Sequence, residues 1–249
     1  HMYHQGIGGV SFVLCNTDAQ ALRNSPVPVK VQLGAKGEGA GNIPEVAKKL
    51  AEESAAEVEA LFDDNTRMAF ITAGMGGGTG TGAAPVVARI AKEKGVLTVG
   101  IVTIPFLFEG EPKILQAFAG VEEMRKHVDA LLVINNERLC KIYPDLSWTT
   151  AFAKADDSLS NAARSIAELV SKDGKINLDF ADVRTTLKDG GAAVISTGSG
   201  EGEHRMSRAI QNALTSPRLK ESDIYGAERV LFNLYFSPEE GEELRMQES

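Results

Sequence analysis

The chain has 249 residues, 43% of them hydrophobic, so it can bury a substantial core and is long enough for one large domain or two. A formal net charge of -8 argues against a surface made to bind nucleic acid or anionic lipid, because both require concentrated Lys and Arg. Two isolated cysteines and the lack of an apolar run of about 18 residues predict a cytoplasmic protein with no disulfide framework and no membrane insertion.

Apolar segments and helical segments alternate along the chain. Nearly continuous apolar runs are typical of strands buried on both faces, and alternation with helices predicts an α/β fold with a mostly parallel sheet covered on both faces. We expect strands at 10–15, 68–73, 96–104, 130–134, 192–197 and 230–236, and helices at 43–62, 83–94, 112–127 and 156–172.

The segment 156–172 has an apolar stripe at helical spacing and opens with two aspartates, which suit a helix N-terminus. It is long enough to connect two subdomains. We therefore predict a first domain over 1–155, a central helix over 156–176, and a smaller, partial α/β domain over 177–249.

Six glycines fall within nine positions, from Gly74 to Gly82, between an expected strand and an expected helix. Free N–H groups at a helix start favour an anion, and glycine lets the backbone approach it closely, so the run predicts a phosphate-binding loop with the helix beginning at Ala83. The run lacks the Lys-Ser/Thr of a Walker loop. A dinucleotide site is disfavoured because Thr103, Ile104 and Pro105 stand where a ribose-binding acid belongs.

The segment GGGTGTG at 76–82 resembles the signature of the tubulin and FtsZ superfamily. Five further segments appear in the order of the FtsZ family of bacterial cell-division GTPases, and the similarity covers essentially the whole chain: NTDAQAL at 16–22, GAGNIPEV at 39–46, TIPFLFEG at 103–110, AFAKADD at 151–157 and INLDFADVRTTL at 176–187. The resemblance implies a tubulin-like GTPase domain, and it implies that the family's first strand and front Gly-rich loop precede residue 1 of this sequence.

The resemblance also assigns a GTP/GDP site, with Mg²⁺ implied by the triphosphate and no metal-ligand cluster in the sequence. Phe152 would pack on the guanine, Asp156 would accept from its donor edge, Asn136 would contact the base, and Glu109 the ribose. Lys113 stands where the family has an arginine, and the Gly34 to Gly39 segment is about three residues short. The phosphates would be held by Gly76, Gly77, Gly78, Thr79, Gly80, Thr81 and Gly82, with Gly39, Ala40, Gly41 and Asn42 on the γ-phosphate side.

Ordinary structural roles remain open for several of these residues. The 39–42 segment could be a plain turn before a helix, and Asp156 could be a charge at a helix N-terminus. Asp179 and Asp182, spaced to share one face of a helix, could be a cap and a solvated charge.

The family's hydrolytic segment corresponds to Asn177, Asp179 and Asp182, which in the family act on the nucleotide of the next subunit. The resemblance thus implies a head-to-tail homopolymer that forms the cytokinetic ring at mid-cell. It also implies membrane-tethering division proteins that bind a C-terminal tail outside these 249 residues. The alternative is a nucleotide-binding structural relative that does not hydrolyse GTP.

Overall fold

The computed structural model describes all residues except 1, 144, 146, 172–178, 216–225 and 236–249. The chain divides into two compact units, residues 1–193 and 194–249, each of which is treated by itself. The expected three-part division of the chain stays a prediction.

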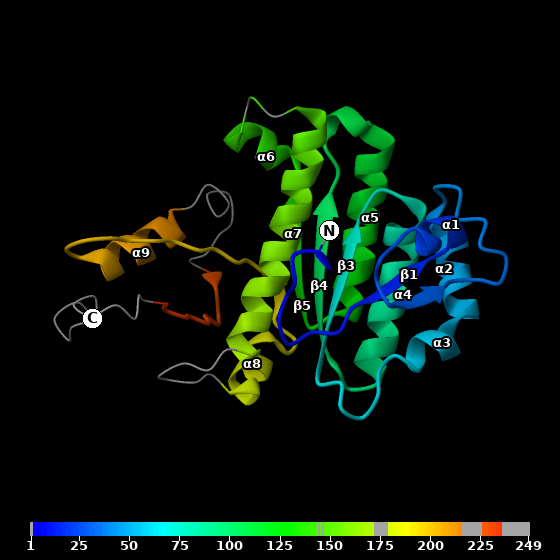
Figure 1. Cartoon of the computed structure of the whole chain (residues 1–249), viewed down its shortest axis with the longest axis horizontal. Helices are drawn as coiled ribbons and strands as arrows, with labels where there is room; N and C mark the ends of the chain where they lie inside the picture. The colour runs from blue at the N-terminus through cyan, green and yellow to red at the C-terminus, as the bar shows by residue number, and fades with distance from the viewer. Residues whose placement is uncertain (1, 144, 146, 172–178, 216–225, 236–249) are drawn as a thin grey trace. The chain divides into compact units, whose positions relative to one another are not determined.

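The first unit is built on a parallel sheet. Strands β3 (Met68–Gly74), β4 (Leu97–Ile104), β5 (Ala130–Asn135) and β6 (Gly191–Ala193) lie side by side in that order (Figure 1). All eight residues of β4 are buried, which explains its continuous apolar sequence. A second, two-stranded parallel sheet pairs β1 (Val13–Asn16) with β2 (Val29–Gln32). The predicted α/β class with parallel strands is confirmed.

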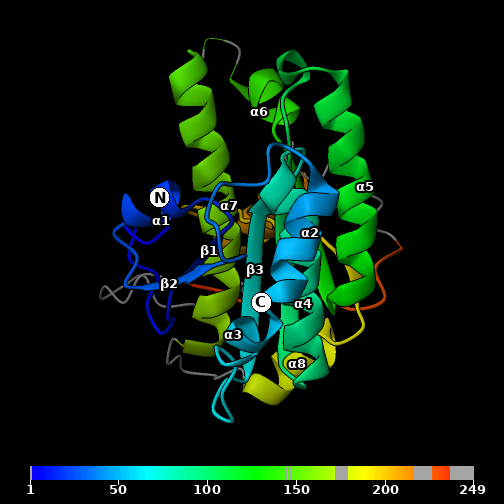
Figure 2. The same ribbon diagram turned by 90° about the vertical axis from the view of Figure 1, so that its right-hand side faces the viewer.

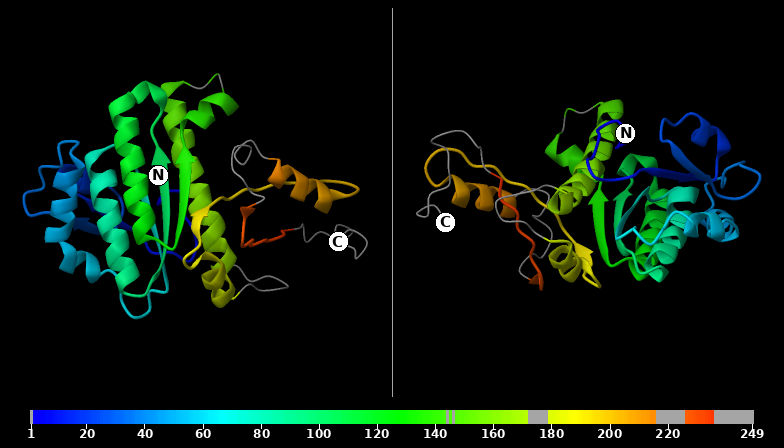
Figure 3. Two further views of the ribbon diagram at one scale, coloured as in Figure 1. Left: turned by 180° about the vertical axis from the view of Figure 1, so that it is seen from behind. Right: turned by 60° about the horizontal axis from the view of Figure 1, so that its bottom comes forward.

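Helices cover both faces of the four-stranded sheet. Helices α4 (Gly78–Glu93) and α5 (Glu111–His127) lie on one face, and α7 (Trp148–Ser171) lies on the other (Figures 2 and 3). Helix α2 (Pro44–Glu53) packs on α4. The shorter elements of this unit are α1 (Ala19–Arg23), α3 (Ala55–Glu59), the 3₁₀ turn η1 (Leu107–Glu109), α6 (Glu137–Ile142) and α8 (Phe180–Leu187).

The main core lies between the sheet and α4 with α5. Val102 of β4 is fully buried there against Ala88 of α4 and Met124 of α5. On the other face, the apolar stripe expected along 156–172 is present, because Ala162, Ala163 and Ile166 of α7 are buried. Small side chains allow α7 to lie close to the sheet.

Several predicted boundaries were wrong for identifiable reasons. The strand expected at 10–15 begins at Val13. The helix expected over 43–62 is broken at Ser54, which ends α2 and precedes α3. The Ser54 hydroxyl is buried and accepts a hydrogen bond from the Gly34 N–H at 2.9 Å, so a tertiary contact holds the break.

The central helix was also misplaced, because α7 begins at Trp148, eight residues before the expected start at 156. Asp156 therefore lies inside a helix, and its interpretation as a helix N-terminal charge was wrong. The strand expected at 192–197 is β6, which ends at Ala193. Residues 230–235 form no strand in the described part of the chain.

The second unit contains α9 (Arg205–Leu214) and a glycine-containing segment that lies against it. The Ser196 hydroxyl donates to the Ala213 carbonyl at 2.7 Å. A Cβ at Gly198 would lie 2.1 Å from the Ala209 carbonyl oxygen, so glycine is required for this close approach.

Candidate functional site at the carboxyl edge of the sheet

The segments that follow β3, β4 and β5 meet at one edge, because the carboxyl ends of parallel strands lie together. The Met75 N–H donates to the Thr103 carbonyl at 2.9 Å, and the Asn136 N–H donates to the Ile104 carbonyl at 3.1 Å. Ligands of open α/β sheets bind at this edge. The structure thus brings the predicted nucleotide residues of three loops together.

Helix α4 points its N-terminus into this edge. It begins at Gly78 rather than at the expected Ala83, so the later glycines of the run form its first turn and Pro85 lies in its interior. Gly77 is the N-cap, with φ of -100° and no capping side chain. The first N–H groups of α4 therefore lack a side-chain cap, and such groups favour an anion.

Most glycines of the run are required by packing. A Cβ would lie 2.1 Å from the Gly74 carbonyl oxygen at Gly80 and 2.0 Å from the Pro44 carbonyl oxygen at Gly82. Gly76 has a φ of +97°, which favours glycine. Only at Gly77 would a Cβ meet nothing closer than 3.9 Å, the distance to Asn42 Oδ1. Of the four, Gly77 is the position that presents open space to a ligand.

The two threonine hydroxyls of the run have partners within the protein. Thr79 Oγ1 lies 2.7 Å from Oγ1 of the buried Thr17, and either can donate. Thr81 Oγ1 is buried and accepts from the Gly76 N–H at 2.9 Å. Thr81 therefore shapes the loop, whereas Thr79 and Thr17 form a shared hydroxyl pair at the start of α4.

The segment 39–42 lies beside the glycine run. Gly39, Gly41 and Asn42 have φ of +82°, +57° and +61°, so the segment is a tight turn before α2 as well as a neighbour of the run. The Gly39 N–H donates to the Thr17 carbonyl at 3.0 Å. Gln116 joins the two loops, since its amide donates to the carbonyls of Gly76 at 3.1 Å and Asn42 at 3.4 Å.

Glu109 and Lys113 form an ion pair at this edge, with 3.3 Å between Lys113 Nζ and Glu109 Oε2. Glu109 also accepts from the Phe106 N–H at 3.0 Å, and Glu137 accepts from the Leu107 N–H at 3.0 Å. Both carboxylates hold the 106–109 turn. A ligand that replaced these contacts would meet the two carboxylates and the adjacent Lys113 ammonium group.

Asn136 carries an unsatisfied acceptor. Its side-chain Oδ1 is buried and, among the described residues, has no hydrogen-bond partner. Leaving such an oxygen unpaired costs on the order of 1–3 kcal/mol, so its position next to the edge of the sheet fits a donor supplied by a ligand.

Phe152 and Asp156 lie one turn apart on α7 and share a face. The Phe152 ring is 43% exposed and meets the Phe106 and Phe108 rings edge-on at 5.3 and 6.0 Å between centroids. Phe106 is fully buried, as expected for a core residue. The Asp156 residue is exposed, but partial desolvation still raises the pKa of its carboxyl above the ordinary value, with a further contribution from the charge of Asp157. An exposed ring beside a carboxylate suits a base with a donor edge.

Asp179 and Asp182 lie elsewhere. Asp179 caps α8 by accepting from the Ala181 N–H, and its own N–H donates to Asp182 Oδ2 at 3.4 Å. The predicted cap and shared face are present, and both residues are exposed. Asn177 lies outside the described residues.

Helix α8 lies at the edge opposite the glycine run. Arg184 of α8 and the C-cap residue Lys188 line a cavity with Val96 and Leu97, at the amino end of β4. The eight residues of β4 separate the two edges by about 25 Å. Figure 1 shows α6 and α8 at opposite ends of α7. One chain therefore does not bring Asp179 and Asp182 to its own glycine run.

Comparison with known proteins decides the family. The model described as the Tubulin/FtsZ family, GTPase domain, matches residues 2–144. The chain belongs to this family. The expected tubulin/FtsZ resemblance is confirmed.

Individual members of the Tubulin/FtsZ family are similar to this chain in sequence and in structure. Cell division protein FtsZ of Porphyromonas gingivalis is 63% identical over 244 residues, which cover 96% of this chain and 53% of that relative. A structure of an empty FtsZ dimer from M. jannaschii matches with a TM-score of 0.81 and 44% identity, over 88% of this chain and 64% of that one. A GTPgS-bound protofilament of CetZ2 from Haloferax volcanii matches at 0.69 and 25%, over 85% and 66%. The chain spans about half the length of the curated relatives that it matches.

Sequence reasoning gave no role to Thr17, Gln116 or Glu137, which organise the loops of this Tubulin/FtsZ site. Thr17 lies within the quoted NTDAQAL segment, which was the only available signal. Gln116 and Glu137 act across contacts between distant segments, which no local pattern reveals.

Among the described residues, no group of three or more His, Cys, Asp or Glu side chains could hold a metal ion. Within the same residues, no helix is both long and apolar enough to cross a membrane.

Proposed function

We propose that the chain binds GTP and GDP at the carboxyl edge of its sheet and hydrolyses GTP in a head-to-tail filament. The observation that carries the proposal is the separation of two half-sites. An uncapped helix start with an open Gly77 lies at one edge, and the exposed Asp179 and Asp182 lie at the other.

The residues at the carboxyl edge fit a guanine nucleotide. The start of α4 and the 39–41 turn offer N–H groups and open backbone for the phosphates, with Thr79 beside them. Glu109 and Lys113 lie at the same edge, where they can contact the ribose and the phosphates. The unpaired Asn136 oxygen, the exposed Phe152 ring and the Asp156 carboxylate suit the base.

Asp156 accounts for the choice of guanine. Guanine presents adjacent N1 and N2 donors, which a carboxylate can accept together, whereas adenine lacks that paired edge. Mg²⁺ accompanies the triphosphate and supplies charge neutralisation when bound.

Hydrolysis is completed in trans. Asp179, Asp182 and Asn177 of one subunit approach the nucleotide of the next, where the carboxylates polarise and orient the attacking water. A contact between different faces of identical chains is heterologous, and it generates an open filament when the rotation does not close. The two half-sites at opposite edges have the placement that such a filament requires.

We further propose that these filaments form the cytokinetic ring at mid-cell in the cytoplasm and bind membrane-tethering division proteins. Support comes from relatives named cell division protein FtsZ at 63% and 46% identity.

Complementation between two inactive variants tests the trans site in the full-length protein. Asp182→Ala removes the amino-edge half, and Gly77→Val obstructs the carboxyl-edge half. Asp182→Ala should retain GTP binding and lose turnover by about a hundredfold or more, the usual scale of a general base. Gly77→Val should bind GTP poorly.

In an equal mixture, random assembly pairs an intact nucleotide half with an intact Asp182 at about one interface in four, so turnover should recover toward that fraction. Turnover per subunit should also rise above a threshold protein concentration. A site contained within one subunit predicts no recovery and constant turnover at every concentration, which would refute the trans mechanism. Filaments without turnover under any condition would instead identify a non-hydrolysing structural relative.

A further inference from the structure

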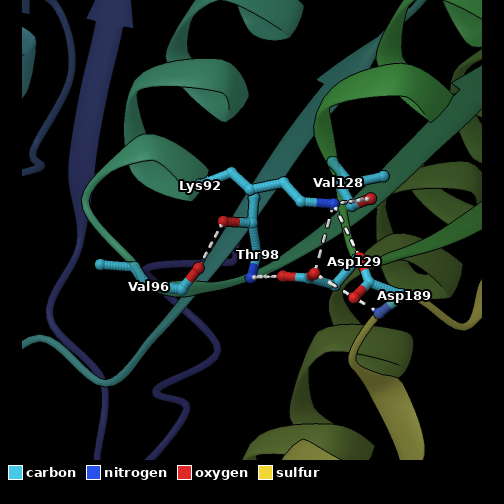
Figure 4. Close-up of polar contacts among 6 residues, drawn as sticks. All are labelled: Lys92, Val96, Thr98, Val128, Asp129 and Asp189. Atoms are coloured by element: carbon cyan, nitrogen blue, oxygen red, sulfur yellow. Dashed lines mark hydrogen bonds and ion pairs between the residues drawn. The ribbon is translucent and has the colours of Figure 1, made fainter.

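A polar cluster, in which Lys92 lies between the buried Asp129 and the exposed Asp189, joins the chain after α8 to the amino edge of the sheet (Figure 4). Asp129 precedes β5, and its side chain is only 6% exposed. Its Oδ2 accepts from the Thr98 N–H at 2.9 Å, and its Oδ1 lies 3.3 Å from Lys92 Nζ. A carboxylate this deeply buried needs such donors.

Lys92 connects Asp129 to Asp189, which lies two residues after the end of α8. Its Nζ donates to Asp189 Oδ1 at 3.2 Å and to the Val128 carbonyl at 3.2 Å. Asp129 itself accepts from the Asp189 N–H at 3.5 Å, and its carbonyl accepts from the Gly191 N–H at 3.0 Å. The chain leaving α8 is therefore tied to the sheet through Asp129 and Lys92.

The cluster lies where apolar packing is incomplete. A cavity of about 190 Å³ lies beside it, lined in part by Arg184 of α8 and the C-cap residue Lys188. Elsewhere along α8, Val183 is fully buried, and the Arg67 guanidinium lies 3.9 Å from the centre of the Phe180 ring. The far end of α8 thus depends on polar contacts for its position.

We propose that Asp129 and Lys92, acting through Asp189, are positioning residues for hydrolysis. They fix the orientation of α8 and so set where the exposed Asp182 enters the site of the next subunit. The inference rests on the proposed trans mechanism, because the cluster lies at the amino edge of the sheet, opposite the glycine run of its own chain. Misplacing a catalytic group by about 1 Å can cost a hundredfold in rate, so a modest rotation of α8 is sufficient.

The test compares Lys92→Met with Lys94→Met in the full-length protein. Lys92→Met keeps much of the aliphatic stem and removes the cation that joins Asp129 to Asp189. Lys94, two residues later, pairs at 2.7 Å with the exposed Glu59 and serves as the matched control. Lys92→Arg keeps a cation and is the conservative variant.

We expect turnover in filaments of Lys92→Met to fall about ten- to a hundredfold, with GTP affinity and the critical concentration for assembly unchanged. Lys94→Met should match the unmodified chain, and Lys92→Arg should recover most of the turnover. Asp189→Asn is a second variant for the case in which Lys92→Met unfolds. Asn tolerates the φ of +51° at this position while removing the ion pair with Lys92.

Mixed filaments separate positioning from general damage. Lys92→Met mixed with Gly77→Val should regain turnover, because its own nucleotide half is intact, whereas Lys92→Met mixed with Asp182→Ala should not. Suppose that Asp182→Ala stops hydrolysis but Lys92→Met and Asp189→Asn leave turnover unchanged. This result would refute the inference and leave the trans mechanism standing. Turnover that survives Asp182→Ala would instead refute the trans mechanism itself.

Discussion

The same substitution at two glycines of one run should have opposite effects. At Gly82, a new Cβ would meet three backbone atoms of α2 and its start, at 2.0, 2.7 and 3.0 Å. Backbone cannot rotate away as a side chain can, so α2 and α4 must separate, at a cost near the upper end of overpacking, about 3 kcal/mol. Alanine recovers about 1 kcal/mol of helix propensity. Gly82→Ala should therefore destabilise the chain by about 2 kcal/mol.

At Gly77, the nearest atom to a new Cβ is 3.9 Å away and φ is -100°, which alanine adopts without strain. Gly77→Ala should leave the free energy of unfolding unchanged or raise it by about 0.4–1 kcal/mol, through the unfolded state. The methyl group projects into the space where we place the phosphates, so GTP affinity should fall.

Urea unfolding without nucleotide, followed by GTP titration of the folded variants, measures both effects. Gly82→Ala should lower the urea midpoint. Gly77→Ala should keep the midpoint or raise it slightly, and weaken binding. Equal midpoints for the two variants would refute the packing argument, and an unchanged GTP affinity for Gly77→Ala would refute the assignment of the open glycine to the phosphates.

Three further outcomes are expected. Phe152→Ala should weaken GTP binding by about 1–3 kcal/mol, the usual range for stacking on an aromatic ring, as measured by titration with the exposed Phe118→Ala as control. Partial desolvation raises the pKa of the Asp156 carboxyl, and only the ionised carboxyl accepts from guanine. On acidification, GTP affinity should therefore begin to fall at a higher pH than it would for an aspartate of ordinary pKa. Asp156→Asn should weaken binding and remove that pH dependence. Burial raises the pKa of the Cys15 thiol to about 11, which lowers the fraction of reactive thiolate at pH 8. In a Cys140→Ser background, alkylation of Cys15 by iodoacetamide at pH 8 should be about a hundredfold slower in the folded chain than in the urea-unfolded chain. Similar rates in the two states would contradict this burial.

Apolar patterning predicted the parallel sheet and its covering helices because the central strands are buried on both faces. It failed where tertiary contacts override local preference. Gly78 to Gly82 have poor helix propensity, yet they begin α4 because neighbouring backbone requires them. Ser54 breaks a segment with helical pattern because its hydroxyl satisfies the Gly34 N–H. Pro44, which faces Gly82, and Gly34, which bonds Ser54, both lie outside any local sequence window around these residues.

The candidate site divides in the same way. The glycine run was visible because its composition departs from that of ordinary helices and loops. Asn136 and Phe152 came from the resemblance, since a lone Asn or Phe carries no signal of its own. The structure adds an unpaired oxygen at Asn136 and an exposed ring at Phe152, which are physical reasons to expect a ligand.

The glycine run shows how one motif serves two demands. Gly80 and Gly82 allow Gly74 and α2 to approach α4 closely, and Gly76 supplies a positive φ that turns the chain into the helix. These positions aim the start of α4 at the carboxyl edge, and Gly77 leaves the space in front of it open. Because different glycines orient the helix and leave the space open, substitutions at Gly76, Gly80 or Gly82 should change stability before they change GTP affinity. Those at Gly77 should weaken affinity without lowering stability.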